Sequence, residues 1–420
     1  MNLISTNNQF NLCLIIFIFS LFLIKSKTIS TNVSLHLNHF ETTITVPNQK
    51  GITRYFSLSL NLTSDYTILD DVYIYSKPVD PSAKKDSITV LRDSSLLICR
   101  EALFPIHLAN NNDINLINFR FYNCPDKILS SSLISLGLAR KFKDYKYSLV
   151  HQLKEQNLIS THQFTIDLNS PGETKGQIYF GESPQNIKNK YKNNQILKCS
   201  TNLSNNWSCP LSKVIISNKD NIHEDNIEPI YEVDLVQNVI LFDTINYQYR
   251  LPKKYLTILE DVVLKKHVKN GQCHFKFNQN FNDIGYYECN CNAVNNFPDL
   301  IFVINGKKMM KINIENMFTQ FEMSDGSEDV CELEIRLSDN ENEWGLGAMF
   351  MKSVVSEFDY DLDEVRIYSR RVYDYNSGMM KISLLVGITL LMCCNIILIV
   401  MLYKEEITKN CIKNYKYNFM

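Results

Sequence analysis

Residues 239–252 read VILFDTINYQYRLP, an apolar run that ends at Asp243 and Thr244 and continues into a more polar stretch. A short apolar run that is rich in β-branched and aromatic residues and is bounded by turn residues predicts a β-strand. We therefore expect a strand at 238–243 that carries Asp243 and Thr244 at its C-terminal end.

Strand-like patterns also occur on both sides of this stretch. Period-two alternation of apolar and polar residues, which is typical of half-buried strands, occurs at 33–38 and 56–62. Further strand-like runs are QFTIDL (163–168), GQIYFG (176–181), DLIFVING (299–306) and EVRIYS (364–369). Helical spacing of apolar residues is limited to 147–157 and 253–268. The sequence thus predicts a mainly β, largely antiparallel protein with few short helices.

Composition bounds the class of protein. The chain has 420 residues, of which 45% are hydrophobic and 21% are charged, so it is too apolar to remain disordered. The formal net charge is -2 and there is no long block of Lys or Arg, so we expect no nucleic-acid partner.

Two hydrophobic segments near the ends predict export and membrane attachment. Residues 12–24, LCLIIFIFSLFLI, have the length of a signal-peptide core, so we expect a signal peptide at 1–27; because no Lys or Arg precedes this run, an uncleaved anchor is the alternative. The segment from Ile382 to Tyr403 carries no formal charge and is long enough to span a bilayer. Lysines in the tail at 404–420 place it in the cytoplasm. We expect a single-pass type I protein of the secretory pathway, at the cell surface or on an endolysosomal or vacuolar membrane.

Cysteines and sequons fit an exported segment. Eight of the 12 cysteines lie between the hydrophobic ends, and an even number in an exported segment predicts disulfides. Four Asn-x-Ser/Thr sequons are candidate glycosylation sites: Asn32, Asn61, Asn202 and Asn206.

From residue 133 to about 367, the order of segments resembles the pepsin-like aspartic proteases. Six stretches carry the resemblance: LISLGLA (133–139), SLVHQLKEQNLISTHQFTIDL (148–168), GQIYFGESP (176–184), VILFDTINYQYRLP (239–252), YYECNCNAVNNFPDLIFVINGKKMMKI (286–312) and LGAMFMKSVVSEFDYDLDEVRI (346–367). The N-terminal half is more diverged, and its best anchor is RYFSLSLNLTSDYTILDDVYIY (54–75).

The resemblance implies a bilobal β fold, with lobes at 28–190 and 191–376, and a cleft that binds a peptide or protein segment. In this family each lobe gives one aspartate, and the two carboxyl groups share a proton and activate a water. The matching positions are Asp70 and Asp243, followed in the second motif by Thr244. The resemblance implies neither a cofactor nor a metal ion.

Several residues depart from the family pattern. Val72 and Ile245 replace the glycines of the two Asp-Thr-Gly motifs, and both are poorly suited to positive φ, so we expect the loops after both acids to be displaced. The flap tyrosine is missing from SITVLRDSS (87–95), and Ser131 and Ala348 stand where the family has aspartates. We expect endopeptidase activity that is weak or lost. The alternatives are a non-catalytic module that binds peptide or protein in the cleft, and a structural coat or adhesion protein.

Nearness in the chain and the resemblance together predict four disulfides: Cys291–Cys331, Cys273–Cys289, Cys199–Cys209 and Cys99–Cys124. The pair Cys289-x-Cys291 is an alternative metal motif, but no paired histidine lies at ligand spacing. His36 and His39 fall on opposite faces of a strand, which argues against a metal pair. The acidic stretch at 358–365 fits a solvated turn better than a calcium site.

Overall fold

The computed structural model describes residues 28–36, 39–47, 53–64, 66–70, 87–92, 95–108, 115–124, 135–140, 147–168, 175–191, 195–201, 206–218, 229–277, 285–306, 308–321 and 329–370. All belong to one compact unit, Met1–Arg370. The predicted signal peptide (1–27), membrane span (382–403), tail (404–420) and acceptor Asn202 lie outside the described residues. Among the residues that are described, no helix has the length and apolar character needed to cross a membrane.

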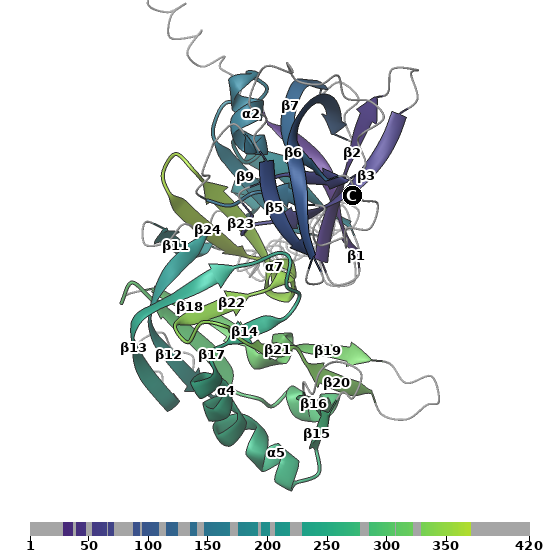
Figure 1. The fold of residues 1–420 in the computed structure, drawn as a ribbon. Helices are drawn as coiled ribbons and strands as arrows, with labels where there is room; N and C mark the ends of the chain where they lie inside the picture. The colour runs from purple at the N-terminus through teal and green to yellow at the C-terminus, as the bar shows by residue number, and fades with distance from the viewer. Residues whose placement is uncertain are drawn as a thin grey trace, which may run out of the picture. The chain divides into compact units, whose positions relative to one another are not determined.

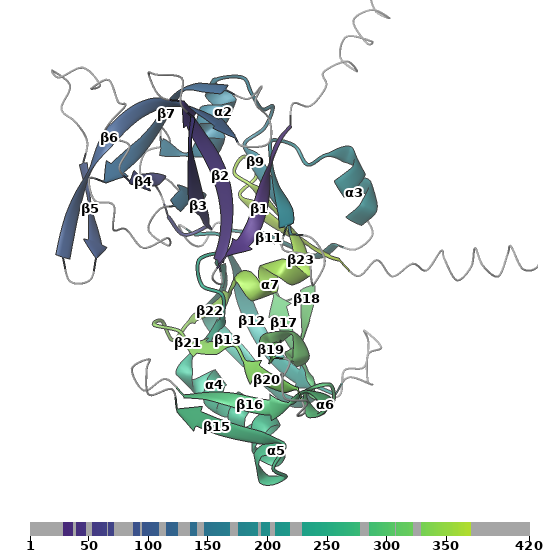
Figure 2. The same ribbon diagram turned by 90° about the vertical axis from the view of Figure 1, so that its right-hand side faces the viewer.

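Most of the described chain is arranged in β-sheets (Figure 1). The largest described sheet has 13 strands, in the spatial order β11 (Gln195–Ser200), β24 (Glu364–Ser369), β23 (Val354–Asp359), β9 (Gln163–Leu168), β10 (Lys175–Phe180), β1 (Ile29–His36), β2 (His39–Pro47), β3 (Thr53–Asn61), β8 (Ser135–Gly137), β4 (Ile68–Asp70), β7 (Asn115–Cys124), β6 (Ser95–Leu108) and β5 (Ser87–Arg92). The β5–β6 hairpin forms one edge of this sheet (Figure 2).

The C-terminal half adds two smaller sheets. The first has seven strands in the order β18 (Lys308–Asn313), β17 (Asp299–Ile304), β12 (Ser208–Ser217), β13 (Pro229–Phe242), β22 (Glu343–Leu346), β14 (Tyr249–Leu251) and β21 (Ile335–Leu337). The second has four strands in the order β15 (Cys273–Phe277), β16 (Gly285–Asn290), β20 (Val330–Leu333) and β19 (Phe318–Phe321).

The described helices are short, and they are α2 (Leu149–Glu155), α3 (Gln185–Tyr191), α4 (Lys253–Leu259), η4 (Glu260–Leu264), α5 (Lys265–Lys269), α6 (Cys291–Val294), η5 (Ile314–Met317) and α7 (Ala348–Ser353). Both predicted helices are present, because α2 falls within 147–157 and the continuous run from α4 to α5 covers 253–268. The predicted strands at 163–168 and 364–369 coincide with β9 and β24. The prediction of a mainly β protein with few short helices is confirmed.

The two halves of the described chain share the large sheet. β23, from the C-terminal half, pairs antiparallel with β9 and brings Phe358 opposite Phe164. The two rings stack with centroids 4.7 Å apart, and Trp207 meets Phe358 edge-on at 5.2 Å. All three side chains are fully buried. Burial of such large rings stabilises the packing between these strands.

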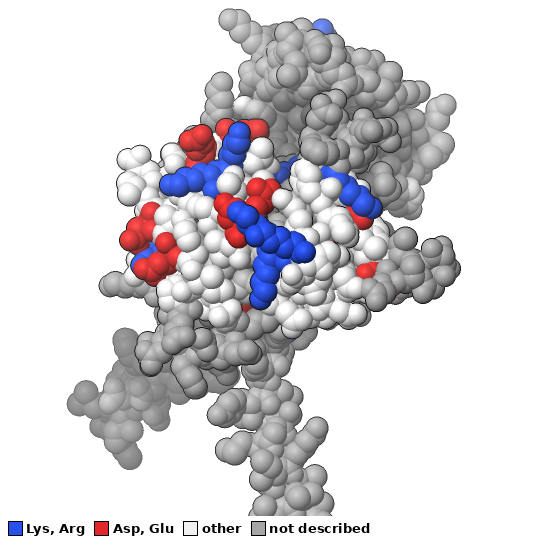
Figure 3. Space-filling model, turned by 90° about the horizontal axis from the view of Figure 1, so that it is seen from below, with Lys and Arg blue, Asp and Glu red and all other residues white. Residues whose placement is uncertain are grey.

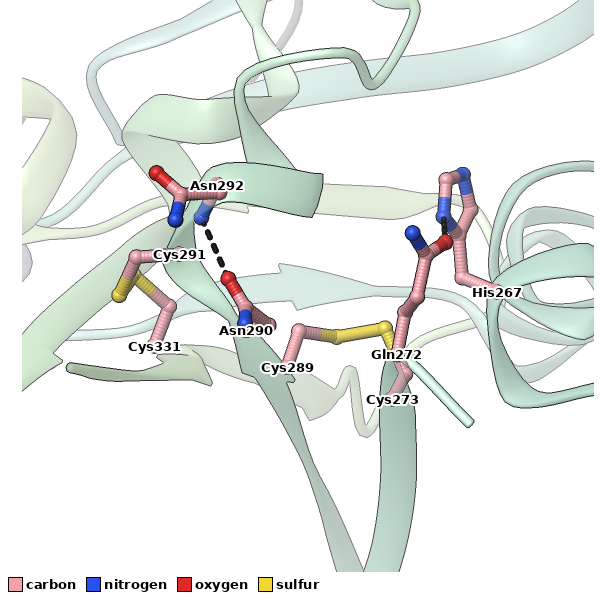
Figure 4. Close-up of a disulfide and its surroundings, with 8 residues drawn as sticks. All are labelled: His267, Gln272, Cys273, Cys289, Asn290, Cys291, Asn292 and Cys331. Atoms are coloured by element: carbon pink, nitrogen blue, oxygen red, sulfur yellow. Dashed lines mark hydrogen bonds between the residues drawn. A yellow bond between two sulfur atoms is a disulfide. The ribbon is translucent and has the colours of Figure 1, made fainter. Parts of the chain in front are cut away.

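Four disulfides staple the described strands, and they are the pairs named from the sequence: Cys99–Cys124, Cys199–Cys209, Cys273–Cys289 and Cys291–Cys331. Figure 4 shows that the last two leave β16 and the start of α6 on either side of Asn290. They tie this segment to β15 on one side and to β20 on the other. Cys289 and Cys291 are therefore both committed to disulfides.

The surface charge is mixed. On the face shown in Figure 3, basic and acidic side chains of the described residues are interspersed. The described part of this face shows no continuous basic stripe.

Helix α2 docks on β7 through one buried amide. The Gln152 side chain, which is 3% exposed, accepts a hydrogen bond from the backbone N–H of Arg120 at 2.7 Å and donates one to its carbonyl at 3.0 Å. Leu149, Val150 and Leu153 of the same helix are completely buried. The helix thus covers the sheet with an apolar face, and the Gln152 amide pairs with the buried polar backbone beneath it.

We expect Gln152→Leu to lower the free energy of unfolding by about 1–3 kcal/mol, because it leaves the backbone groups of Arg120 without their partners in a buried place. Urea denaturation of the purified protein measures this loss. Glu155→Leu, at the exposed end of the same helix, is the control and should change stability little. Equal effects of the two substitutions would contradict this role of Gln152.

Candidate active site

The backbone of the site in the C-terminal half is built by two parallel strands. β13 runs beside β22 with Phe242 opposite Leu346, and the N–H of Asp243 donates to the Leu346 carbonyl at 3.0 Å. The chain then loops over Gly347, where an added Cβ would lie 2.3 Å from the carbonyl oxygen of Gln248. Only glycine fits there, so the loop closes tightly above β22.

The carboxylate of Asp243 is buried and fully engaged, with only 2% of the residue exposed. Its Oδ1 accepts from the backbone N–H groups of Ile245 at 2.9 Å and Asn246 at 3.3 Å. Its Oδ2 accepts from the side-chain amide of Asn246 at 2.6 Å and from the Arg250 guanidinium at 3.0 Å. Four donors therefore surround the two carboxylate oxygens.

Arg250, which lies in β14, makes this an ion pair. Its Nη2 is 3.0 Å from Asp243 and 3.7 Å from Glu343, and its side chain is 18% exposed. The guanidinium crosses Gly345, where an added Cβ would lie 2.7 Å from the Arg250 Nε. Gly345 thus provides the space that the arginine needs to reach the buried acid.

Thr244 connects the C-terminal half to the N-terminal half. Its buried hydroxyl donates to the carbonyl of Leu60 at 2.5 Å and accepts from the N–H of Leu62 at 3.3 Å. These two residues flank Asn61 at the end of β3. Asn61 is therefore the residue that the structure places across from the Asp243–Thr244 segment.

Strand pairing in the N-terminal half repeats the C-terminal arrangement. β3 runs parallel to β8 with Leu60 opposite Leu136, as Phe242 is opposite Leu346. β4 crosses β8 at Ile68 and Ser135, as β14 crosses β22 at Arg250 and Gly345. The spacing agrees as well, because Ile68 follows Asn61 by seven residues and Arg250 follows Asp243 by seven. Asn61 is the counterpart of Asp243 in this repeat, and Ile68 is the counterpart of Arg250.

The loop after Asn61 also has the local geometry of its counterpart. The Oδ1 of Asn61 accepts from the N–H of Thr63 at 2.9 Å, as Asp243 accepts from Ile245. Gly137 lies under this loop as Gly347 lies under the other, since an added Cβ would be 2.6 Å from the backbone of Tyr66. The Asp-Thr-Gly positions of the N-terminal half are thus Asn61, Leu62 and Thr63.

Asp70 was the first acid expected from the sequence, and the structure gives its place to Asn61. Asp70 ends β4 and pairs in parallel with Cys124 of β7, nine residues beyond Asn61. In the repeat it corresponds to Pro252, which follows β14. The side chain of Asp70 and the residues at 71–86 lie outside the description. The apolar stretch before Asp70 resembles the expected motif in sequence. This stretch forms β4, however, whereas the strand that pairs in parallel with β8 is β3.

The loop after Asp243 stays close to the Asp243 carboxylate, and its displacement relative to the family remains a prediction. Among the described non-glycine residues, positive φ occurs at Asn157, Gln237, Asn305 and Asp363, and Ile245 is not one of them. Its N–H still reaches the carboxylate, so β-branching at this position is tolerated. The corresponding expectation for Val72 concerns a residue that lies outside the description.

Among the side chains that the structure describes, no second carboxyl group stands across from Asp243. Across from Asp243 stands an amide, which cannot titrate in the range of a carboxyl group, and the lone pairs of Asp243 are already used. Nearby phenols do not replace the missing acid, because burial raises the pKa of both Tyr247 and Tyr249. Each oxygen of the Asp243 carboxylate thus already accepts two hydrogen bonds within the described residues.

Other predicted site residues lie apart from this centre. Asn32 is exposed on β1, whereas Asn206 precedes β12 and is partly buried. A glycan on Asn61, the third described sequon, would occupy the former site itself. The acidic stretch at 358–365 forms the β23–β24 turn, and its acids have partners that the sequence did not reveal: Asp361 contacts His162, and Asp363 contacts Arg140.

Removing Arg250 tests the ion pair. We expect Arg250→Leu to lower the free energy of unfolding by about 3–5 kcal/mol, because the buried carboxylate of Asp243 loses its only cationic partner among the described residues. The double variant Asp243→Asn/Arg250→Leu should recover much of this loss, since no uncompensated charge is left. Denaturant unfolding of both variants decides the matter, and additive effects would contradict the coupling.

Comparison with known proteins agrees with this geometry. A family model described as eukaryotic aspartyl protease matches residues 126–369, more than half of the 420 residues. The crystal structure of the aspartic proteinase from Irpex lacteus is similar in fold, with a TM-score of 0.58 and 14% sequence identity over 81% of this chain and 97% of that one. No curated protein matches. The pepsin-like fold expected from the sequence is confirmed, and the chain belongs to the eukaryotic aspartyl protease family.

Proposed function

We propose that this chain is a non-catalytic member of its family that binds peptide or protein segments in the former substrate cleft without cleaving them. The observation that carries the proposal is Asn61, which stands where the N-terminal half of a working enzyme provides its aspartate. In a site whose members act together, loss of one member removes most of the rate.

The ion pair at Asp243 supports the same conclusion independently. A general base must offer a free lone pair to the water that it activates. Here, Arg250 and Asn246 occupy Oδ2, while two backbone N–H groups occupy Oδ1. Restoring a carboxyl group at position 61 alone would therefore leave Asp243 still paired with Arg250.

Binding can outlast catalysis because the two depend on different features. This chain has the link through Thr244, the aromatic packing across the shared sheet and four disulfides. The fold of the family implies a cleft that accepts an extended peptide. A rigid framework with an inert centre is suited to holding such a segment.

We further propose that this module is displayed on the lumenal or outer side of a secretory-pathway membrane. The charge-free segment at 382–403, the apolar run at 12–24 and the disulfide pairs support this location. Surface display of a module that binds without cutting is consistent with a receptor or adhesion role.

We expect no cleavage of a peptide library by the purified protein between about pH 3 and pH 7, the range in which carboxyl groups titrate. Asn61→Asp should not restore activity, because Arg250 still occupies Asp243. Mass spectrometry of the products measures cleavage, with Asp243→Asn as the control. Acid-dependent cleavage by the wild-type protein that disappears in Asp243→Asn would restore the enzyme interpretation and reject the proposal.

The same library, immobilised, tests binding. We expect enrichment of a peptide class by the wild-type protein and its loss in Asn61→Tyr, which places a bulky side chain at the centre of the cleft. Asn32→Tyr also removes a sequon, but it lies on the exposed face of β1 and should bind normally. Peptide mapping should find Asn61 unmodified. A glycan at Asn61, or equal binding by the two variants, would rule out binding in the cleft.

A further inference from the structure

A histidine pair joins the two halves on the side of α2. The rings of His151, in α2, and His162, just before β9, stack with centroids 4.6 Å apart. The His162 Nδ1 is 2.8 Å from the Asp361 carboxylate, which belongs to the β23–β24 turn at 360–363. One carboxylate from the C-terminal half thus faces two imidazoles from the N-terminal half.

The cluster has little capacity for a second positive charge. His151 is bonded through Nδ1 to the buried hydroxyl of Ser148 at 3.0 Å and packs edge-on against the ring of Tyr360 at 5.4 Å. Lys154, on the same helix, adds positive charge near Asp361. The other acid of the turn, Asp363, is already paired with Arg140 at 2.9 Å.

The same turn is bonded to the floor of the former active site. The Tyr360 hydroxyl donates to the carbonyl of Leu138 at 3.2 Å, and the Trp207 Nε1 donates to the same oxygen at 2.6 Å. The N–H of Leu138 in turn donates to the carbonyl of Asn61 at 2.8 Å. A short chain of contacts therefore runs from the histidine pair to the cleft residue Asn61.

We propose that His151 and His162 form a pH-sensitive latch that holds the β23–β24 turn against the N-terminal half near neutral pH and loosens it on acidification. When both rings carry a proton, two adjacent cations compete for Asp361, and the contact of Tyr360 with His151 is disturbed. Loosening of the turn weakens the bond from Tyr360 to Leu138 and, through it, the support of Asn61. If the cleft binds a peptide segment, as the proposed function holds, opening of the latch releases that segment in an acidic compartment.

The direction of the pH effect follows from His151. Burial, with a contribution from His162, lowers its pKa to about 4, below the 6.5 of an unperturbed histidine. The unfolded state therefore takes up this proton first, so stability is complete above about pH 6.5 and declines as the pH falls towards 4. The pKa of Asp361 is also lowered, mainly by hydrogen bonds from His162 acting against burial, so its effect belongs to still lower pH.

Hydrogen exchange of the full-length protein at about pH 7 and pH 5, corrected for the intrinsic exchange rate, tests the latch without any ligand. We expect faster exchange at 136–140 and 360–363 at the lower pH, and loss of most of this increase in His151→Gln, which keeps a polar partner for Ser148 but cannot take a charge. His274→Gln, on the exposed side of β15, is the matched control and should behave as wild type.

His162→Gln provides a second variant that removes one of the two cations, and it should also abolish the increase. An equal increase in wild type and both variants, or no increase in wild type, would overturn the latch. Because the exchange experiment contains no peptide, failure of cleft binding leaves its result intact, and the two proposals fail separately.

Discussion

The two hydrogen bonds of the Thr244 hydroxyl group are the interaction on which the geometry of the candidate site depends. The hydroxyl bonds to the carbonyl of Leu60 and to the N–H of Leu62, and so fixes one loop of the C-terminal half against the end of β3. Being fully buried, these polar groups would be costly to leave without partners. The register of the two halves is therefore set at this point, and it decides which residue stands across from Asp243.

The register places an amide there, and the rest of the site is consistent with that change. A buried carboxylate without a proton-sharing partner needs compensation, which Arg250 supplies. The arginine in turn requires a residue without a side chain at position 345, and glycine is present. The residues at positions 61, 250 and 345, which lie on three different strands, are thus compatible with one another. This agreement supports the proposal that the site holds structure and does not cleave peptides.

The contacts around Leu138 connect Asn61 to the β23–β24 turn and to Trp207. Its N–H supports Asn61, and its carbonyl receives donors from Trp207 and Tyr360, which belong to the other half. The aromatic cluster formed by Phe164, Phe358 and these two residues surrounds the connection. The proposed latch depends on this route, because a chain of packed side chains and hydrogen bonds is the kind of network that can carry coupling between two sites.

The sequence by itself determined the architecture. Alternating apolar residues fix strand and face, because side chains in a strand alternate with period two, and this information is local; β9 and β24 therefore lie where the pattern put them. The ordered motifs indicated the family, and nearness in the chain together with that resemblance predicted the disulfide pairs. Asp243 and Thr244 were also recognised, because their strand is well preserved.

Only the tertiary structure decided what faces Asp243. Asp70 follows an apolar run and looks like a motif residue, whereas Asn61 lies in a run that reads as an ordinary strand end. The difference between them is which strand pairs in parallel with β8, and pairing is a long-range property that no local pattern encodes. The same holds for the contact of His162 with Asp361, because these two residues are 199 positions apart in the chain. The sequence identified the fold, and the contacts between distant segments determined what chemistry that fold still supports.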